Sequence, residues 1–417
     1  MCAVSELGRI ASREDAVAAD ATCPLAGVRA RFDIPAGVTY LDGNSLGALA
    51  SHVPARVDAG VRGEWGRDLI TSWNDNGWWT LPRRVGDRIG ALVGAAPGQV
   101  ICGDSTSVQL FQALVAMARL RPDRRVLVTD GDGFPTDQYV AESVARLLGL
   151  RLVRVSPPDL AAVLSEDVAC VAFSAVDYRS GELWDAAGIT EAAHGAGAVM
   201  LWDLCHAAGA VPFDLDGLGA DGAVGCTYKY LNGGPGSPAW IYLPTRHQDV
   251  IDLPLTGWQG HAAPFDLEQS YSPADGVDRA RIGTPPVLSM LALEAALDVF
   301  DDAPIALIRT KSQRLTQLVI DFASTTLPTV TVGTPVDPAR RGSQVALRMP
   351  SAYEVTQALI ARGVIGDFRA PDVLRLGFAA PYLSYVEVWD AMQTLRDVLA
   401  TEAWRDPAYA RGDAAVT

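Results

Sequence analysis

Short apolar runs alternate with amphipathic stretches between Gln99 and Pro244, and this alternation limits the fold of the chain more than any other feature. The apolar runs are rich in β-branched residues, which favour strands. Four of them are expected as strands: Arg125–Asp130, Arg151–Val155, Val168–Val176 and Val199–Leu204. Helices are expected between them, at Ser107–Leu120, Asp137–Leu148, Asp159–Leu164 and Ile189–Ala196. Such alternation predicts an α/β fold with a mostly parallel sheet covered by helices, in which ligands bind beyond the carboxyl ends of the strands.

The C-terminal part of the chain has a different order of elements. Two long helical patterns, Leu288–Phe300 and Leu307–Ser324, lead into it. Beyond them the expected elements are a strand at Gln344–Met349, a helix at Tyr353–Arg362, a strand at Val373–Phe378 and a helix at Tyr385–Ala400. We therefore expect a large domain over residues 51–300 and a smaller α+β domain over residues 301–417, which the N-terminal segment 1–50 joins.

Charge and composition exclude several classes of protein. The 34 Lys plus Arg stand against 49 Asp plus Glu, a net charge of −15, which argues against a nucleic-acid partner because phosphate binding needs clustered positive charge. No uncharged apolar run approaches the roughly 18–20 residues that span a membrane, and the N-terminus has no apolar signal-peptide core. Six cysteines without Cys-x-x-Cys spacing predict reduced thiols and a cytoplasmic protein. Five scattered histidines predict no metal site.

The chain has only two lysines, so chemistry that needs a primary amine has two candidates. Lys311 lies on the polar face of a helical pattern and is interpreted as a solvated surface charge. Lys229 follows the apolar run Ala223–Cys226, is flanked by Tyr228 and Tyr230, and precedes a glycine-rich turn. Burial lowers the pKa of an amine and so favours the neutral nucleophile. From spacing alone, a covalent role and a structural role of Lys229 both remain open.

Two further elements could complete a cofactor site. Asp203 ends an expected strand 26 residues before Lys229, where a carboxylate can pair with the protonated ring nitrogen of pyridoxal phosphate; a helix N-cap is the alternative. His206 could lie beside such a ring. The segment Gly103–Val108 opens a helix, and free N–H groups there suit a phosphate, although a simple capping box would have the same sequence.

Together these segments resemble kynureninase, a pyridoxal-phosphate enzyme of the aspartate-aminotransferase fold (fold type I). The resemblance covers nearly the whole chain. The motifs that carry it are YLDGNSLG at 40–47, FPTD at 134–137, WDLCHAAGAVP at 202–212, YKYLNGGPG at 228–236, GWQGH at 257–261, GTPP at 283–286, and VIGDFR and LRLGF within 364–378.

The resemblance implies a role for each matching residue. The residues expected to bind the cofactor are Thr106, Ser107, Phe134, Pro135, Thr136, Asp137, Ser174, Asp203, His206, Tyr228, Lys229, Trp258 and Thr284. Lys229 would hold the cofactor through its amine and later move the α-proton of the substrate, and Asp203 would pair with the ring nitrogen. Phe134 would stack on the ring. Tyr228 would bind the phosphate, and it is also a candidate donor to the substrate γ-carbonyl.

The resemblance also implies the substrate and the assembly. Arg375 would bind the substrate carboxylate, while Ser45 and Trp73 would lie near its aromatic end. Trp258 and Thr284 would reach the phosphate of a neighbouring subunit, so a homodimer is expected, with the active site at the interface. The implied reaction is hydrolytic cleavage of L-kynurenine to anthranilate and L-alanine, with hydroxylated or methylated kynurenines left open. The alternatives are a related lyase such as a cysteine desulfurase, or an inactive binding protein.

Overall fold

The structure is a computed structural model that describes residues 8–411. Its chain divides into two compact units. The large unit comprises residues 53–175 and 184–295, and the small unit comprises residues 8–52, 176–183 and 296–411. Within residues 8–411, no helix is both long enough and apolar enough to cross a membrane.

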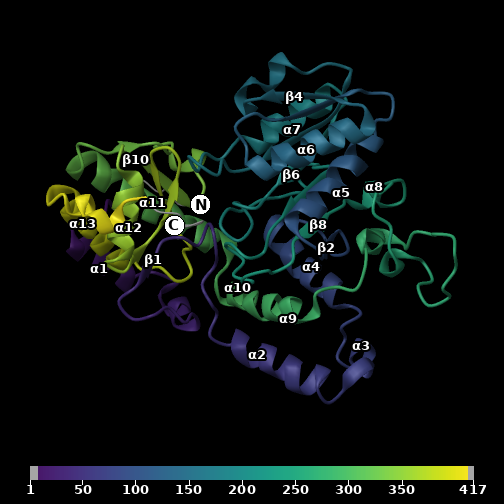
Figure 1. Ribbon diagram of the computed structural model, residues 1–417, viewed down its shortest axis with the longest axis horizontal. Helices are drawn as coiled ribbons and strands as arrows, with labels where there is room; N and C mark the ends of the chain where they lie inside the picture. Colours follow the sequence, from purple (N-terminus) through teal and green to yellow (C-terminus); the bar gives the residue numbers. More distant parts are fainter. Residues whose placement is uncertain (1–7, 412–417) are drawn as a thin grey trace. The chain divides into compact units, whose positions relative to one another are not determined.

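The large unit is built on a mixed, mostly parallel sheet, as the sequence predicts (Figure 1). In the described part of the chain it has seven strands in the order β2-β8-β7-β6-β5-β3-β4, and only β8 runs antiparallel to its neighbours. The strands are β2 (Val100–Cys102), β3 (Val126–Asp130), β4 (Arg151–Val155), β5 (Val168–Ser174), β6 (Val199–Asp203), β7 (Gly222–Gly225) and β8 (Trp240–Tyr242). The helices are α2 (Val53–Ala59), α3 (Ser72–Asp75), α4 (Leu81–Val93), α5 (Thr106–Arg119), α6 (Pro135–Leu148), α7 (Ala186–Gly195), α8 (Thr245–Gln248) and α9 (Val287–Ala296).

Both faces of the central strands are buried, which explains why they lack polar alternation. Successive side chains of a strand point to opposite faces. In β6, Leu201 belongs to the core that includes Leu114 of α5, whereas Trp202 points the other way and donates to the hydroxyl of Thr190 on α7 at 3.1 Å. The sheet is therefore covered by helices on both sides, and its parallel strands can present functional groups only at their ends.

The small unit contains an antiparallel sheet of order β12-β13-β10-β9 and a parallel pair of β1 and β11. Its strands are β1 (Thr39–Tyr40), β9 (Thr331–Val332), β10 (Gln344–Arg348), β11 (Val364–Ile365), β12 (Asp367–Arg369) and β13 (Val373–Gly377). Its helices are α1 (Arg13–Ala21), α10 (Val299–Asp302), α11 (Ile305–Thr326), α12 (Ala352–Ile360) and α13 (Tyr385–Ala400). Helix α13 begins with a capping box in which Ser384 and Glu387 satisfy each other's backbone N–H groups.

Two expected helices have a different form. The stretch expected as a helix at Asp159–Leu164 is a 3-10 helix over Pro157–Ala162. Its first two residues are prolines, which lack the backbone N–H group that the hydrogen bonds of a longer α-helix need. The pattern Leu288–Phe300 is two helices, α9 and α10, separated at Leu297 and Asp298. The apolar periodicity of the sequence continues through Leu297 and Asp298, so the pattern does not indicate that the helix is interrupted there.

Lys311 is not the solvated surface charge that its sequence context suggested. It lies on α11 and is 5% exposed. Burial lowers the pKa of its ammonium, while Cys23, Asp20 and Glu387 beside it oppose that shift. The polar face of α11 therefore meets polar groups of the N-terminal segment and of α13 instead of water. This long-range packing leaves no trace in the local pattern of α11.

Asp221, which precedes β7, fixes several segments at the amino-terminal edge of the large sheet. Its carboxylate accepts from the Met200 N–H at 2.8 Å, lies 2.7 Å from Nε2 of both His194 and His247, and pairs with Arg246 at 3.1 Å. Burial by itself raises the pKa of Asp221, but the hydrogen bonds from His247, Met200 and His194 outweigh it and hold the pKa below the usual range.

We expect Asp221→Asn to destabilise the protein by about 2 kcal/mol at pH 7, because it removes the buried carboxylate that accepts from Met200, His194 and His247. A lowered carboxyl pKa stabilises the fold above the unfolded pKa of about 3.9, and this contribution is lost as the pH falls through the folded pKa. The difference between wild type and variant should therefore shrink below about pH 4. Urea unfolding of wild type and variant, at pH 7 and at a pH below about 4, gives the free energies of unfolding to compare. Asp252→Asn, an exposed partner of Arg119, is the control and should cost less than about 1 kcal/mol.

Candidate functional site

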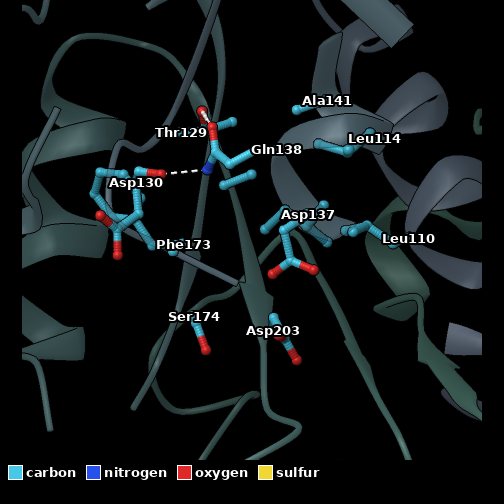
Figure 2. A pocket seen from close by; sticks show the side chains of 13 residues that line it. Leu110, Leu114, Thr129, Asp130, Asp137, Gln138, Ala141, Phe173, Ser174 and Asp203 are labelled. Atoms are coloured by element: carbon cyan, nitrogen blue, oxygen red, sulfur yellow. Dashed lines mark hydrogen bonds between the residues drawn. The ribbon is translucent and has the colours of Figure 1, made fainter. Parts of the chain in front are cut away.

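A pocket of the large unit lies where three parallel strands end side by side. Strand β3 ends at Asp130, β5 at Ser174 and β6 at Asp203, and Ser174 is in register with Asp203. Helix α6 begins directly after β3, and its Gln138 donates to the Asp130 carbonyl. The residues that line the pocket are Leu110, Leu114, Thr129, Asp130, Gly133, Asp137, Gln138, Ala141, Ala172, Phe173, Ser174, Leu201 and Asp203 (Figure 2). The sheet thus places these polar groups where α/β folds bind ligands.

Asp137 and Asp203 form a carboxyl pair within this pocket. Figure 2 shows the Asp137 carboxyl group, from the first turn of α6, directed toward Asp203. Burial raises the pKa of Asp137 well above its usual range, and the charge of Asp203 and a hydrogen bond to it act in the same direction. Asp203 also accepts from the Cys205 N–H at 2.7 Å. Burial and the neighbouring Asp203 therefore favour the protonated form of Asp137 within this pair.

Lys229 lies in the turn that follows β7. The N–H of Asn232, a residue with φ of 58°, donates to the Lys229 carbonyl, and the Gly233 N–H donates to Thr227. The Lys229 ammonium lowers the pKa of Asp137, so it lies within electrostatic range of the carboxyl pair. Its Nζ is 2.9 Å from His206 Nε2 and 6.0 Å from the centroid of the Phe134 ring. The structure thus brings together the amine, the imidazole, the aromatic ring and the carboxyl pair.

The start of α5 offers backbone N–H and hydroxyl groups that could bind an anion. Ser105 caps the helix by accepting from the Val108 N–H at 3.4 Å. Thr106 and Ser107 occupy the first turn, where N–H groups have no partner within the helix and attract anions. Leu110 and Leu114 of the same helix line the pocket with Asp203. The capping and anion-site interpretations of this segment are therefore compatible.

These residues fit the cofactor that the sequence resemblance implies. Pyridoxal phosphate needs a primary amine for its aldehyde, a negative charge for its ring nitrogen and N–H or hydroxyl donors for its phosphate. Lys229, Asp203 and the first turn of α5 supply those three groups in the large unit. Tyr228 contacts the Cys226 thiol, and burial raises the pKa of its phenol, which keeps it protonated and able to donate.

Arg375 lies in the small unit, in the middle of the buried strand β13. Asp367 of β12 stands directly opposite it in register, and the Asp367 carboxylate pairs with both Nε and Nη2 of the guanidinium. Ser45 accepts from Nη2 at 3.0 Å, and the Tyr178 carbonyl accepts from Nη1 at 2.6 Å. The structure therefore brings Ser45 and Arg375, two of the expected substrate residues, into direct contact.

Asn44 and Asp367 are partners of Arg375 that the sequence analysis did not single out. The Asn44 amide oxygen, turned toward the guanidinium, lies 2.9 Å from Nε and 3.2 Å from Nη2. Asn44 fits here because Gly377 has no side chain: a Cβ there would lie 1.7 Å from the other terminal atom of the Asn44 amide, which is its nitrogen in this orientation. Both residues fall within the quoted motifs YLDGNSLG and VIGDFR, which were the only available signal.

Of the other expected site residues, Pro135 and Thr136 open α6. Trp73, Trp258 and Thr284 belong to an aromatic cluster and an exposed loop of the large unit. Trp79 packs against both Trp73, at 6.3 Å between ring centroids, and Trp258, at 5.7 Å. Phe265 completes the cluster at 5.2 Å from Trp79. Trp258 is 42% exposed and Thr284 is exposed. Trp73 and Trp258, expected in different roles, are thus joined through Trp79, which the sequence did not reveal as a link.

Metal-binding groups and disulfides are absent from the part of the chain that the structure describes. No cluster of three or more His, Cys, Asp or Glu side chains between residues 8 and 411 could hold a metal ion. The five cysteines in that range are free thiols, and four of them are buried. Cys2 lies outside the described residues.

Comparisons with known proteins agree on one family. A model described as the kynureninase C-terminal domain matches residues 308–395. A protein named kynureninase from Burkholderia pseudomallei (strain 1106a) is 48% identical over 409 residues, which cover 96% of this chain and 98% of that protein. One of the same name from Pseudomonas fluorescens is 44% identical over 408 residues, covering 95% and 98%.

Solved structures share the fold. An apo cysteine desulfurase from Thermococcus onnurineus NA1 has a TM-score of 0.77 at 16% identity, covering 90% of this chain and 98% of that one. A cysteine desulfurase from Escherichia coli also has a TM-score of 0.77, at 18% identity with the same coverage. The α/β architecture expected from the sequence is confirmed by this likeness.

Proposed function

The chain belongs to the kynureninase family, and on that premise we propose that it hydrolyses the Cβ–Cγ bond of L-kynurenine, giving anthranilate and L-alanine. The observation that carries the proposal is the near-full-length identity to relatives that bear this name. Pyridoxal phosphate is the cofactor, and the enzyme is a hydrolase acting on a carbon–carbon bond. When bound, the cofactor accepts the electron pair that is left when a bond to the substrate α-carbon or β-carbon breaks.

Lys229 is the group to which we assign the proton transfers. A base must remove the substrate α-proton, and an acid must return a proton to the alanine fragment. The contact of 2.9 Å between Lys229 Nζ and His206 Nε2 supports this role, because it fixes the amine in place and gives it a partner for proton exchange. Which atom donates depends on the tautomer of the imidazole.

Asp203 and Asp137 have different roles in this proposal. The Asp203 carboxylate holds the proton on the ring nitrogen of the cofactor by charge attraction. Asp137, whose pKa is raised, is the member of the pair that we assign as the hydrogen-bond donor to Asp203. We assign to Tyr228 the donation to the substrate γ-carbonyl as water attacks it, and its raised pKa supports that role.

We assign the substrate carboxylate to Arg375, whose planar guanidinium is suited to carboxylates. Ser45, in contact with it, and Trp73 are assigned to the rest of the substrate. We also propose a homodimer in which Trp258 and Thr284 complete the partner's site. Their exposure in the described chain supports this assignment. The free thiols support a cytoplasmic protein.

A side-by-side assay tests the proposed function. The protein loaded with pyridoxal phosphate should release anthranilate from L-kynurenine, and we expect kcat/KM to be higher for it than for 3-hydroxykynurenine or methylated analogues. Fluorescence of the aromatic product measures each rate. L-Cysteine is the control substrate, because the structural relatives include cysteine desulfurases. Release of alanine from L-cysteine, with the sulfur recovered as sulfide after reduction by an added thiol, and without cleavage of any kynurenine, would contradict the proposal.

A further inference from the structure

The guanidinium of Arg375 is nearly saturated by its own protein partners. Asp367 takes Nε and one N–H of Nη2, Ser45 takes the other N–H of Nη2, and the Tyr178 carbonyl takes one N–H of Nη1. These contacts occupy four of the five N–H groups of an arginine. The residue is also only 1% exposed. Arg375 alone can therefore give an incoming carboxylate one hydrogen bond, unless it breaks a contact that holds it in place.

Arg369 also pairs with Asp367, but fewer of its guanidinium N–H groups are bound by protein acceptors. Its Nη2 is 2.6 Å from Asp367 Oδ2 and 3.5 Å from Ser45 Oγ. Its Nε is buried and has no hydrogen-bond partner among the described residues, whereas its side chain as a whole is 35% exposed. A buried N–H without an acceptor is costly, so this group is a donor in need of a ligand.

The charges around the two arginines favour an anion. Asp367 is the carboxylate that they share, at contact distance from both guanidinium groups. The other nearby acid is Asp42, and burial, followed by the charge of Asp367, raises its pKa to about 7. At neutral pH Asp42 is therefore only partly ionised. The two arginines therefore outweigh Asp367 and the partly ionised Asp42, and the small positive charge that remains favours an anionic ligand.

We propose that Arg369 is a second arginine that binds the α-carboxylate of the substrate, through the guanidinium N–H groups that no protein acceptor occupies. Arg375 supplies the remaining N–H of Nη1 to the same carboxylate. Asp367 acts as a positioning residue, because it holds both guanidinium groups at fixed places. The inference rests on the proposed function in one respect: it takes the substrate to be an amino acid that carries an α-carboxylate.

Binding of two ligands that differ only in the carboxylate tests this inference. β-Benzoylpropanoate has the aryl ketone, the chain length and the carboxylate of the substrate, whereas butyrophenone ends in a methyl group. Isothermal titration calorimetry on the cofactor-loaded protein gives both Kd values without a need for turnover. We expect Arg369→Gln to raise the Kd of β-benzoylpropanoate by about 10- to 100-fold and that of butyrophenone by less than about threefold.

Two further variants complete the design. Arg369→Lys keeps the charge and loses the planar group, so it should show an intermediate loss confined to the carboxylate-bearing ligand. This variant carries the test if Arg369→Gln does not fold. Arg348→Gln is the matched control, because Arg348 lies in β10 of the same sheet and pairs with Asp372 at the surface. It should leave both Kd values unchanged.

Two results would overturn the inference. Equal weakening of both ligands in the Arg369 variants would indicate a structural role, and an unchanged Kd for β-benzoylpropanoate would leave the carboxylate to Arg375 alone. Failure of the proposed function is a separate outcome. In that case wild type would not cleave kynurenine, while the carboxylate-dependent loss in Arg369→Gln would still be measured.

Discussion

Replacing Lys229 with alanine will lower kcat for kynurenine cleavage by about 10⁴-fold or more, because the covalent anchor of the cofactor and the base for the α-proton are lost together. The fold should persist, since the contacts of the Lys229 amine with His206 and the Phe134 ring take no part in the backbone hydrogen bonds that hold its turn. Steady-state kinetics and the absorbance of the bound cofactor measure the loss. Residual activity within about tenfold of wild type would refute the role of Lys229.

The second lysine supplies the control for this experiment. Borohydride reduction should fix the cofactor covalently to one peptide, the one that contains Lys229. Lys311 is 5% exposed and lies among Asp20, Cys23 and Glu387 of the small unit, so it should stay unlabelled. Lys311→Arg should keep both the label and the activity. Labelling of Lys311 in the wild type would contradict the assignment of the cofactor lysine.

Replacing Asp203 with asparagine should lower kcat by about 100-fold or more, because the ring nitrogen of the cofactor loses the charge that keeps it protonated. Asp137→Asn is the matched control. The raised pKa of Asp137 favours its neutral form, so a neutral amide should replace it at a cost below about tenfold. Steady-state kinetics of both variants give the comparison. Equal losses in the two variants would show that the charge is not localised on Asp203.

The sheet of the large unit could be predicted because its strands are unusual in composition. Strands β3, β5 and β6 are buried on both faces and appear in the sequence as continuous apolar runs. Strands β2 and β8, with three residues each, and β7, with four, were not among the expected strands. A run that short has no periodicity of its own.

The residues of the candidate site also fall into those that local sequence patterns predict and those that depend on contacts between distant segments. Asp203 and Lys229 follow strands of the sheet, so local patterning located both. The environment of Arg375 could not be predicted, because Ser45 and Arg375 are 330 positions apart and meet only through the pairing of β1, β11, β12 and β13. The burial of Lys311 depends on Asp20 and Glu387 in the same manner. Contacts between distant segments have no signature in either segment alone.

The burial of Lys311 has a practical consequence for chemical labelling. The chain has two lysines; one is nearly inaccessible, and the other is the partly buried amine assigned to the cofactor. Reagents that acylate amines therefore find no freely exposed lysine, and trypsin can cut the intact surface only at arginines. A lysine introduced at a chosen surface position would be a unique handle there, apart from the α-amino group, for attaching a dye or a solid support.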